Sequence, residues 1–226
     1  MATSYESLLP EILPMVAGCP DSMAENAIRS AVIELCEKSG AYQAELDPVT
    51  TVASTYEYDL EAPNGTTVHK IMWASHIGKD LEPISTTLLE QREPNWRDAA
   101  KFSTPKYFVK QTPTTFWLVP VPSETKPLST ILRVQLKPSH TSAVCDDGIM
   151  SDYRDTIVNG AIFRLLRIPN KDWSDLSGAQ IYAAAFAEGI RNAEIRAKNA
   201  DAGVARKVNY GGLPNGIRRN RRGYRS

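Results

Sequence analysis

The sequence predicts an α+β protein: a helical bundle built from N- and C-terminal helices, an inserted small antiparallel β-domain, and an extended basic C-terminal tail. Apolar residues recur at helical spacing before residue 48 and again after Cys145, whereas the period is two in between. The last 24 residues carry seven basic side chains and no acidic one. The predicted segments are the N-terminal helices of the bundle (1–47), the β-domain (48–140), the C-terminal helices of the bundle (141–203) and an Arg-rich arm (204–226).

The N-terminal helices are predicted from apolar stripes and from the residues that interrupt them. Apolar side chains share one face of residues 5–16, but Pro10 and Pro14 remove amide donors, so only a short, imperfect helix is expected. A second helix is expected to begin at a capping box, Ser22–Glu25, and to end at Gly40. Its apolar stripe consists of Ala24, Ile28, Ala31, Val32, Leu35 and Cys36.

Short antiparallel strands are expected in the middle of the chain, where polar and apolar residues alternate. The strand candidates are residues 56–60, 67–75, 107–111, 115–121 and 129–136. Asn64-Gly65 is predicted to form the hairpin turn between the first two strands. Eight prolines between Pro83 and Pro138 are typical of short strands with exposed edges and loops.

Two further helices are predicted after Cys145. Asp146 or Asp147 caps the first, which ends before Pro169, and Ser177–Gln180 is a capping box for the second. The inward residues of the first are Ile149, Tyr153, Ile157, Ala161, Leu165 and Leu166. Those of the second are Ala179, Tyr182, Ala183, Phe186, Ile190, Ala193 and Ala197. The alanine-rich stripe favours a close approach of neighbouring helices.

Length and composition indicate an ordinary globular protein. The 226 residues are 42% apolar and 23% charged, which excludes collagen, coiled-coil arrays and wholesale disorder. No run of about 18 apolar residues and no signal peptide is present, so no membrane association is expected. The three cysteines cannot all pair with one another, which favours a reducing compartment over a disulfide scaffold.

No enzymatic or metal-binding motif is found, so neither catalysis nor a cofactor is expected. His69 and His76 lie seven residues apart on a predicted strand, which places them on opposite faces. His140 and Cys145 lack a second pair of ligands at zinc spacing. Residues 211–216 have the glycine spacing of a phosphate loop without its Lys-Ser/Thr.

The C-terminal arm is the strongest anomaly in the charge distribution. The chain has 26 basic and 26 acidic residues, so the seven basic residues of the arm leave the first 202 residues with 19 basic and 26 acidic side chains, a net charge of −7. The arm has too little apolar content to form a core and is expected to become ordered on a partner. The candidate partner-binding residues are Arg206, Lys207, Tyr210, Arg218, Arg219, Arg221, Arg222, Tyr224 and Arg225. Guanidinium groups fit both nucleic-acid phosphates and protein carboxylates.

Two blocks of sequence resemble the head-to-tail adaptor (connector) proteins of tailed bacteriophages over residues 5–195. The first block contains Leu8-Leu9-Pro10, Pro14 and Gly18-Cys19-Pro20, followed by Ile28, Ala31 and Cys36. The second contains Phe116-Trp117-Leu118-Val119-Pro120, Leu136-Lys137-Pro138-Ser139, Ile157-Val158-Asn159-Gly160-Ala161, Leu165-Leu166, Pro169, Trp173 and Phe186. The family fold, a helical bundle with a β-insertion, agrees with the fold predicted from the apolar periods.

The resemblance implies a structural virion protein of the neck, assembled in the host cytoplasm. It implies a homo-oligomeric, dodecameric ring below the portal protein, with monomers before assembly, and with tail or neck proteins on the other side. The arm would reach the portal, and DNA would pass through the channel without sequence-specific binding. An acidic body would repel the DNA phosphates and so avoid trapping them. The alternative function is a nucleic-acid-binding protein that uses the Arg-rich tail.

Overall fold

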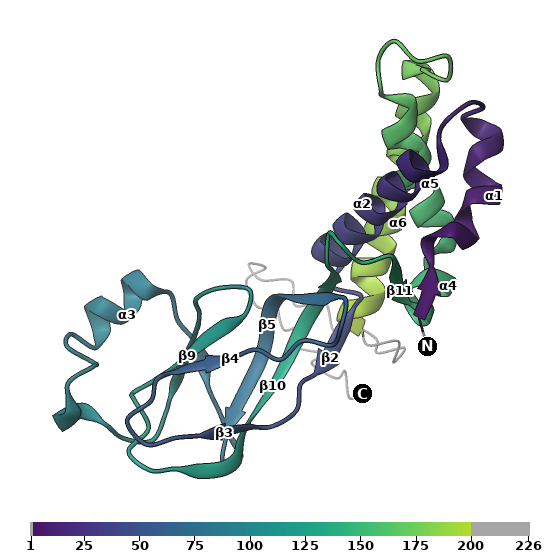
Figure 1. Cartoon of the computed structure of the whole chain (residues 1–226). Helices are drawn as coiled ribbons and strands as arrows, with labels where there is room; N and C mark the ends of the chain where they lie inside the picture. The colour runs from purple at the N-terminus through teal and green to yellow at the C-terminus, as the bar shows by residue number, and fades with distance from the viewer. Residues whose placement is uncertain (1, 200–226) are drawn as a thin grey trace, which may run out of the picture.

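A helical unit and a β unit are joined end to end in the structure (Figure 1). The structure is a computed structural model and describes residues 2–199. It confirms the predicted α+β class, with six α-helices and mainly antiparallel sheets in the described part of the chain. The helical unit contains β1 (Ala2–Ser4), α1 (Leu9–Ile12), α2 (Asp21–Ser39), β11 (Val144–Asp146), α4 (Asp147–Asp152), α5 (Arg154–Leu166) and α6 (Leu176–Asn199).

The β unit is formed by the chain between α2 and β11. Its strands are β2 (Gln43–Glu45), β3 (Val49–Thr51), β4 (Glu57–Asp59), β5 (Thr66–His76), β6 (Lys79–Asp80), β7 (Glu82–Pro83), β8 (Tyr107–Lys110), β9 (Thr115–Val119) and β10 (Lys126–Pro138). Helix α3 (Thr86–Arg92) lies in the connection between β7 and β8. Strand β2 pairs with β10 although it precedes residue 48, and the division of the chain at residues 47, 140 and 203 stays a prediction.

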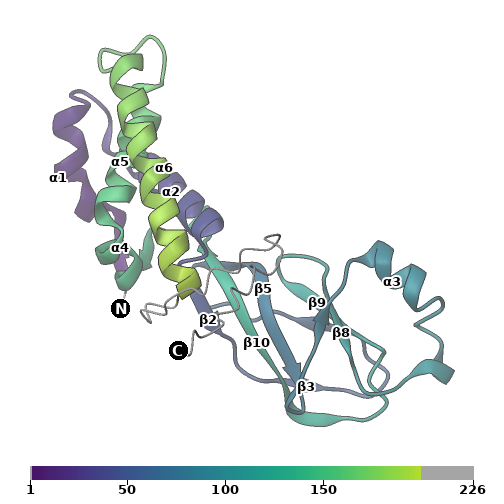
Figure 2. The same cartoon turned by 180° about the vertical axis from the view of Figure 1, so that it is seen from behind.

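In the helical unit, α2, α5 and α6 contact one another around one apolar core (Figure 2). The close approach predicted from small residues occurs between α5 and α6, where Gly160 leaves room for the ring of Phe186. A Cβ atom on Gly160 would lie 2.6 Å from Phe186 Cε2 and 3.0 Å from Ala31 Cβ. On the other side of the same contact, Gly189 of α6 lies against Thr156 of α5.

The broken N-terminal helix is confirmed. A 3₁₀ turn (Tyr5–Leu8), the short helix α1 and a second 3₁₀ turn (Leu13–Met15) follow one another. Pro10 and Pro14 each lie in the first turn of a segment, where a proline leaves no helical hydrogen bond unmade. Strand β1 precedes these turns and pairs with β11, so the described N-terminal residues lie against the start of α4.

Both predicted capping boxes are wrong. Helix α2 begins at Asp21, with Pro20 in extended conformation at its N-cap and without a side-chain cap. Helix α6 begins at Leu176, and the carboxylate of Asp175 accepts a hydrogen bond from the Ser177 amide at 3.0 Å. In each case the residue just before the predicted box already sets the helical conformation, so the box falls inside the first turn.

Other helix-end predictions are confirmed. Helix α2 stops at Gly40, which has a φ of +66° and donates its amide to Cys36 O at 3.2 Å. Asp146 caps α4 by accepting from the Gly148 amide at 2.9 Å. The predicted single helix after it is interrupted, because Tyr153 (φ −117°, ψ +23°) separates α4 from α5.

The β unit is a sandwich of two sheets with a shared core. One sheet has the order β2-β10-β5-β6, with β3 also paired to β10, and the other has the order β4-β9-β8-β7. Leu132, Val134 and Leu136 of the first sheet pack with Phe116 and Leu118 of the second, and all five are fully buried. The alternation predicted for residues 129–136 therefore holds for its apolar face.

One prediction inside the β unit does not hold. Asn64-Gly65 does lie in a turn, with Gly65 at a φ of +76°, but it forms no hairpin. Strand β4 pairs with β9 and β5 pairs with β10, so the turn carries the chain from one sheet to the other. In β5 the register shifts at two places against β10, and the buried residues Val68, Ile71 and Ala74 are three apart. Bulges therefore break the strict period of two in β5. His69 nevertheless lines the groove on the outer face of the sheet, whereas His76 is buried, so the two histidines lie in different surroundings as predicted.

No secondary structure was predicted for residues 76–106. In the structure, part of this segment forms a small apolar cluster against the second sheet. Ser85 caps α3 by accepting from the Leu88 amide at 3.3 Å. Leu89 and Trp96 are buried in one cluster with Val119 of the second sheet and Val121, which follows β9. The serine before an apolar pair was the sequence signal available for this helix.

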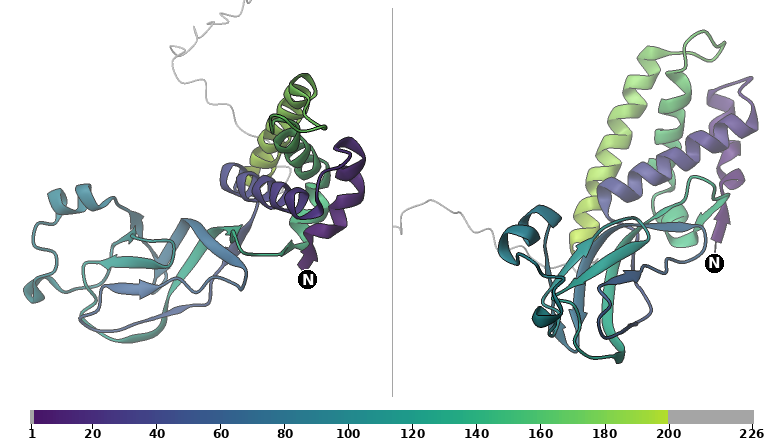
Figure 3. Two further views of the ribbon diagram at one scale, coloured as in Figure 1. Left: turned by 45° about the horizontal axis from the view of Figure 1, so that its top comes forward. Right: turned by 60° about the vertical axis from the view of Figure 1, so that its left-hand side comes forward.

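The C-terminal end of α2 lies where the helical unit meets the β unit (Figure 3), and polar side chains join the two units there. Gln135 of β10 is buried, and its Nε2 donates to the carbonyls of Cys36 at 2.7 Å and Glu37 at 3.0 Å. Lys137 Nζ lies 2.5 Å from Glu37 Oε1. The last carbonyls of a helix have no partner within the helix, so β10 satisfies them and fixes α2 on the sheet.

Candidate binding surfaces

The nine residues predicted to bind a partner lie outside the described residues. They are Arg206, Lys207, Tyr210, Arg218, Arg219, Arg221, Arg222, Tyr224 and Arg225. Their role in binding therefore stays a prediction. What the structure shows is the point from which the chain leads to them: α6 runs the length of the helical unit and ends at Asn199, beside the sheet of β5 and β10 (Figure 2).

A groove of about 750 Å³ lies at this point, between the ends of α2 and α6 and the outer face of the sheet. Its apolar part contains Met72, which is 45% exposed, and Trp73, whose ring lies 5.8 Å from the Arg133 guanidinium carbon. Its charged part contains residues of both signs, among them Lys70 and Glu194. A lining of apolar side chains and charges of both signs suits a protein as binding partner better than a nucleic acid, whose backbone is uniformly negative.

Two smaller cavities lie where the edges of the two sheets meet. One of about 240 Å³ separates β3 from β4 and is lined by Asp47, Asp59 and Glu61, which we call the acidic seam. Within the described part of the chain, no cation forms a salt bridge with these three carboxylates. Like charges held together in this way repel one another, and a cationic partner would relieve the repulsion.

The other cavity, of about 350 Å³, lies between β5 and β8. It is lined by His69, Lys110, Lys137 and His140, which we call the basic seam. Lys110 Nζ donates to the carbonyls of Val68 at 2.9 Å and His69 at 2.7 Å, along the open edge of β5. Burial, together with repulsion from Lys137, lowers the pKa of Lys110.

His140 was considered in the sequence as a metal ligand with Cys145, and the structure places the two in different surroundings. His140 is exposed and lines the basic seam, whereas Cys145 is 5% exposed in the core of the helical unit. No group of three or more His, Cys, Asp or Glu side chains among residues 2–199 is arranged to hold a metal ion. The seam residues come from three strands and the segment after β10, which the sequence order does not reveal.

The cysteines and the aromatic residues have structural surroundings rather than reactive ones. Cys19, Cys36 and Cys145 are free and buried, and burial raises the pKa of the Cys145 thiol to about 12. A thiol with a raised pKa is a poor nucleophile. Near α3, the Arg97 guanidinium lies over the rings of Trp96 at 4.5 Å and Trp117 at 5.4 Å. This contact ties the β7–β8 connection to the second sheet.

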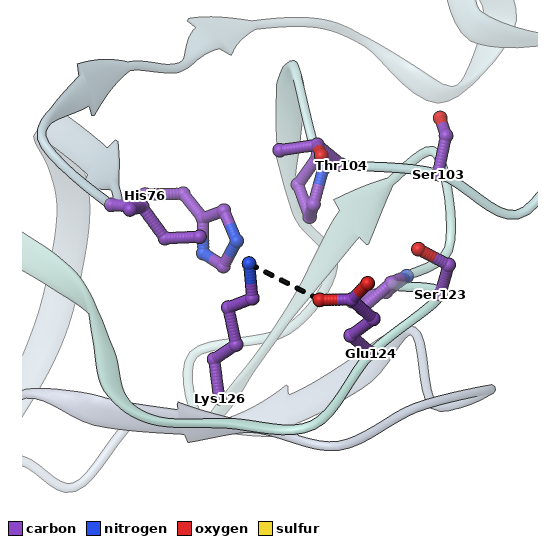
Figure 4. Close-up of a pocket in the computed structure, with 9 residues that line it drawn as sticks. His76, Ser103, Thr104, Ser123, Glu124 and Lys126 are labelled. Atoms are coloured by element: carbon purple, nitrogen blue, oxygen red, sulfur yellow. Dashed lines mark ion pairs between the residues drawn. The ribbon is translucent and has the colours of Figure 1, made fainter.

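A pocket of about 100 Å³ at the far end of the β unit contains His76 (Figure 4). The His76 ring is 3% exposed, and its Nδ1 lies 3.0 Å from Thr130 Oγ1. Lys126 points into the same pocket and pairs with Glu124 at 3.3 Å. Burial, and after it the charge of Lys126, lower the pKa of His76 from its ordinary value of 6.5.

We expect the free energy of unfolding to fall as the pH drops below 6.5, because the unfolded chain then binds a proton at His76 that the folded chain does not. One such group contributes at most about 1.4 kcal/mol per pH unit. His76→Asn should flatten this dependence in urea unfolding measured across that range. Burial also lowers the pKa of His69, so His69→Asn should flatten the dependence in the same direction. His140 is exposed, and His140→Asn is the matched control. An unchanged slope in His76→Asn would show that His76 is protonated equally in both states.

The described residues form charged and apolar contact surfaces on the helical unit and the β unit. Surfaces of this kind suit the binding of other proteins. No helix among the described residues is long and apolar enough to cross a membrane. In the comparison with family models, the model described as SU10 adaptor protein matches residues 4–208, and the chain belongs to that family. No curated protein matches the sequence significantly.

Family membership confirms the resemblance to phage head-to-tail adaptors. It identifies a structural, non-enzymatic kind of protein, located in the virion, that interacts with other head and tail proteins of the phage. The match covers the helical unit, the β unit and the first residues of the arm. It lends no support to the alternative of a nucleic-acid-binding protein.

Proposed function

We propose that this protein forms a ring, of about twelve copies by family resemblance, that joins the portal of the capsid to the tail and surrounds the DNA channel. The observation that carries the proposal is the adaptor-family match over residues 4–208, nearly the whole chain. In the proposed ring, the helices before and after the β unit act as one bundle. The β unit then projects from this bundle as an inserted domain.

The charge distribution along the chain supports different partners for the C-terminal arm and for the body. Helix α6 ends at Asn199 beside the groove of about 750 Å³ between α2, α6 and the sheet. The arm, which follows in the sequence, carries seven basic side chains. In the proposed function this arm binds the portal, and a different surface of the body receives the tail or neck proteins. The net charge of −7 on the first 202 residues repels DNA phosphates and so keeps the channel free of tight DNA binding.

Electron microscopy of the purified full-length protein mixed with the portal of the same phage tests the proposal. We expect a ring of added density on the portal, coaxial with its channel, and a corresponding gain in mass by mass photometry. The protein alone is expected to remain monomeric or nearly so. Portals without added mass at saturating protein concentration would contradict the adaptor role proposed here.

A further inference from the structure

We propose that neighbouring copies of this chain meet through their β units, with the acidic seam of one copy seated against the basic seam of the next. The acidic seam is Asp47, Asp59 and Glu61, and the basic seam is His69, Lys110, Lys137 and His140. The proposal rests on the ring of the proposed function and names the surface through which the ring closes.

The sheet topology places the two seams at opposite edges of the sandwich. In the first sheet, Thr130 of β10 pairs with Val49 of β3 on one side and with His76 of β5 on the other. In the second sheet, β9 separates β4 from β8. The acidic seam lies between β3 and β4. The basic seam lies between β5 and β8, beyond the parts of these strands that pair with β6 and β7. The two seams are two strand spacings apart, about 10 Å, and the edges face away from each other.

Opposite edges with opposite charges meet one requirement of a ring, because each copy then offers two different surfaces that can bind each other. A closed ring of identical subunits uses a head-to-tail contact, in which one surface of each copy fits a different surface of the next. Seams of equal sign would repel across such a contact, whereas these attract. The second copy is therefore the partner whose chemistry is already complementary to both seams.

Several charged groups in each seam can form further hydrogen bonds or salt bridges with such a partner. Lys110 uses two of its three protons on main-chain carbonyls and makes no salt bridge with a described carboxylate. Lys137 is paired with Glu37, which also lies 4.0 Å from His69 Nδ1, so one carboxylate serves two seam residues. Across the sandwich, Asp59 and Glu61 are exposed and without a described cation.

The open strand edges point to the same contact. Strand β6 pairs only with Ser75 and His76 of β5, so most of the β5 edge faces the basic seam rather than another strand. Strand β4 pairs with β9 alone and has a free edge at the acidic seam. Exposed strand edges are sites of unwanted pairing in a free protein, and a neighbouring subunit that covers them removes this hazard.

Cysteine crosslinking between two full-length variants tests the contact. Glu61→Cys and His140→Cys each place one thiol in one seam, at exposed positions, while the three native cysteines are buried. A short bismaleimide added to the mixture of the two variants should give a covalent heterodimer. Each variant alone should give at most a tenth of that yield, because equal seams do not meet. Glu90→Cys on α3 mixed with His140→Cys is the matched control.

The crosslink is measured on the free chains at high concentration and on chains assembled on the portal. A heterodimer in either sample supports the seam contact, and Asp59→Asn introduced into the Glu61→Cys chain should lower its yield several-fold. Yields at the control level in both samples overturn the contact, even if portal docking is normal. If inorganic phosphate binds at the basic seam while no heterodimer forms, the seam is an anion site and the subunit contact is wrong.

Discussion

Removal of residues 204–226 is expected to abolish docking on the portal while leaving the body folded. The arm carries seven of the 26 basic residues, and each exposed ion pair contributes about 0–1 kcal/mol. The five arginines from Arg218 to Arg225 together then contribute at most about 5 kcal/mol, a factor on the order of 10³ in affinity. Burial of Tyr210 and Tyr224 would add to this. Mass photometry of portal with intact or truncated protein measures the loss.

Two full-length variants separate the effect of the guanidinium geometry of the arm from the effect of its charge. Replacement of its arginines by lysine keeps the charge but removes the planar fork that binds carboxylates bidentately, so partial loss of docking is expected. Replacement of the arginines by glutamine removes both the charge and the guanidinium, and should reduce docking almost as much as the truncation does. Circular dichroism and melting of all three proteins should match the intact chain. Docking by the truncated protein with unaltered affinity would show that the anchor lies in the body.

Binding assays on the same proteins distinguish the two partners that guanidinium groups can bind, nucleic-acid phosphates and protein carboxylates. Binding to random duplex DNA through these charges would weaken steeply with salt, whereas a shaped protein contact would weaken less. Tight binding of the intact chain to DNA at physiological salt, lost on truncation, would favour nucleic acid as the partner of the arm.

Most elements of the fold could be predicted from the sequence because they depend on local spacing. The stripe of α2, its stop at Gly40 and the alternation in β10 all reflect which face of one element is buried. Helix starts were less predictable, since Pro20 and Asp175 each lie two residues before the expected cap and precede the first helical residue. Asn64-Gly65 shows a further limit: a turn motif fixes the local backbone but not which strands pair across it.

The candidate surfaces divide in the same way. The basic arm is visible in composition alone, because its charges are consecutive. The two seams were not predicted. The basic seam joins residues from strands far apart in sequence, such as His69, Lys110 and Lys137, and the acidic seam joins the segments beside β3 and β4, whose strands pair in different sheets. Charge counts summed over the chain cancel these local differences.

The contact between α5 and α6 supplies the largest expected change in stability. Gly160→Leu should lower the free energy of unfolding by about 3 kcal/mol or more, because the new side chain has no space in a packed core. Even its Cβ would lie 2.6 Å from Phe186 Cε2 and 3.0 Å from Ala31 Cβ, and both neighbours are buried. A protein of this size loses about 2–4 °C in melting temperature per kcal/mol, so a drop of about 10 °C is expected.

Ala187→Leu adds the same side chain on the exposed face of α6 and should change stability by no more than about 0.5 kcal/mol. If the loss in Gly160→Leu comes from the Phe186 ring, then Phe186→Ala in that background should cost much less than in the natural chain, where it costs about 3–5 kcal/mol. Urea unfolding of the four proteins gives this coupling directly. Additive losses would show that α5 moves away from α6 as a whole, in which case the small residues at the crossing do not fix the distance between the helices.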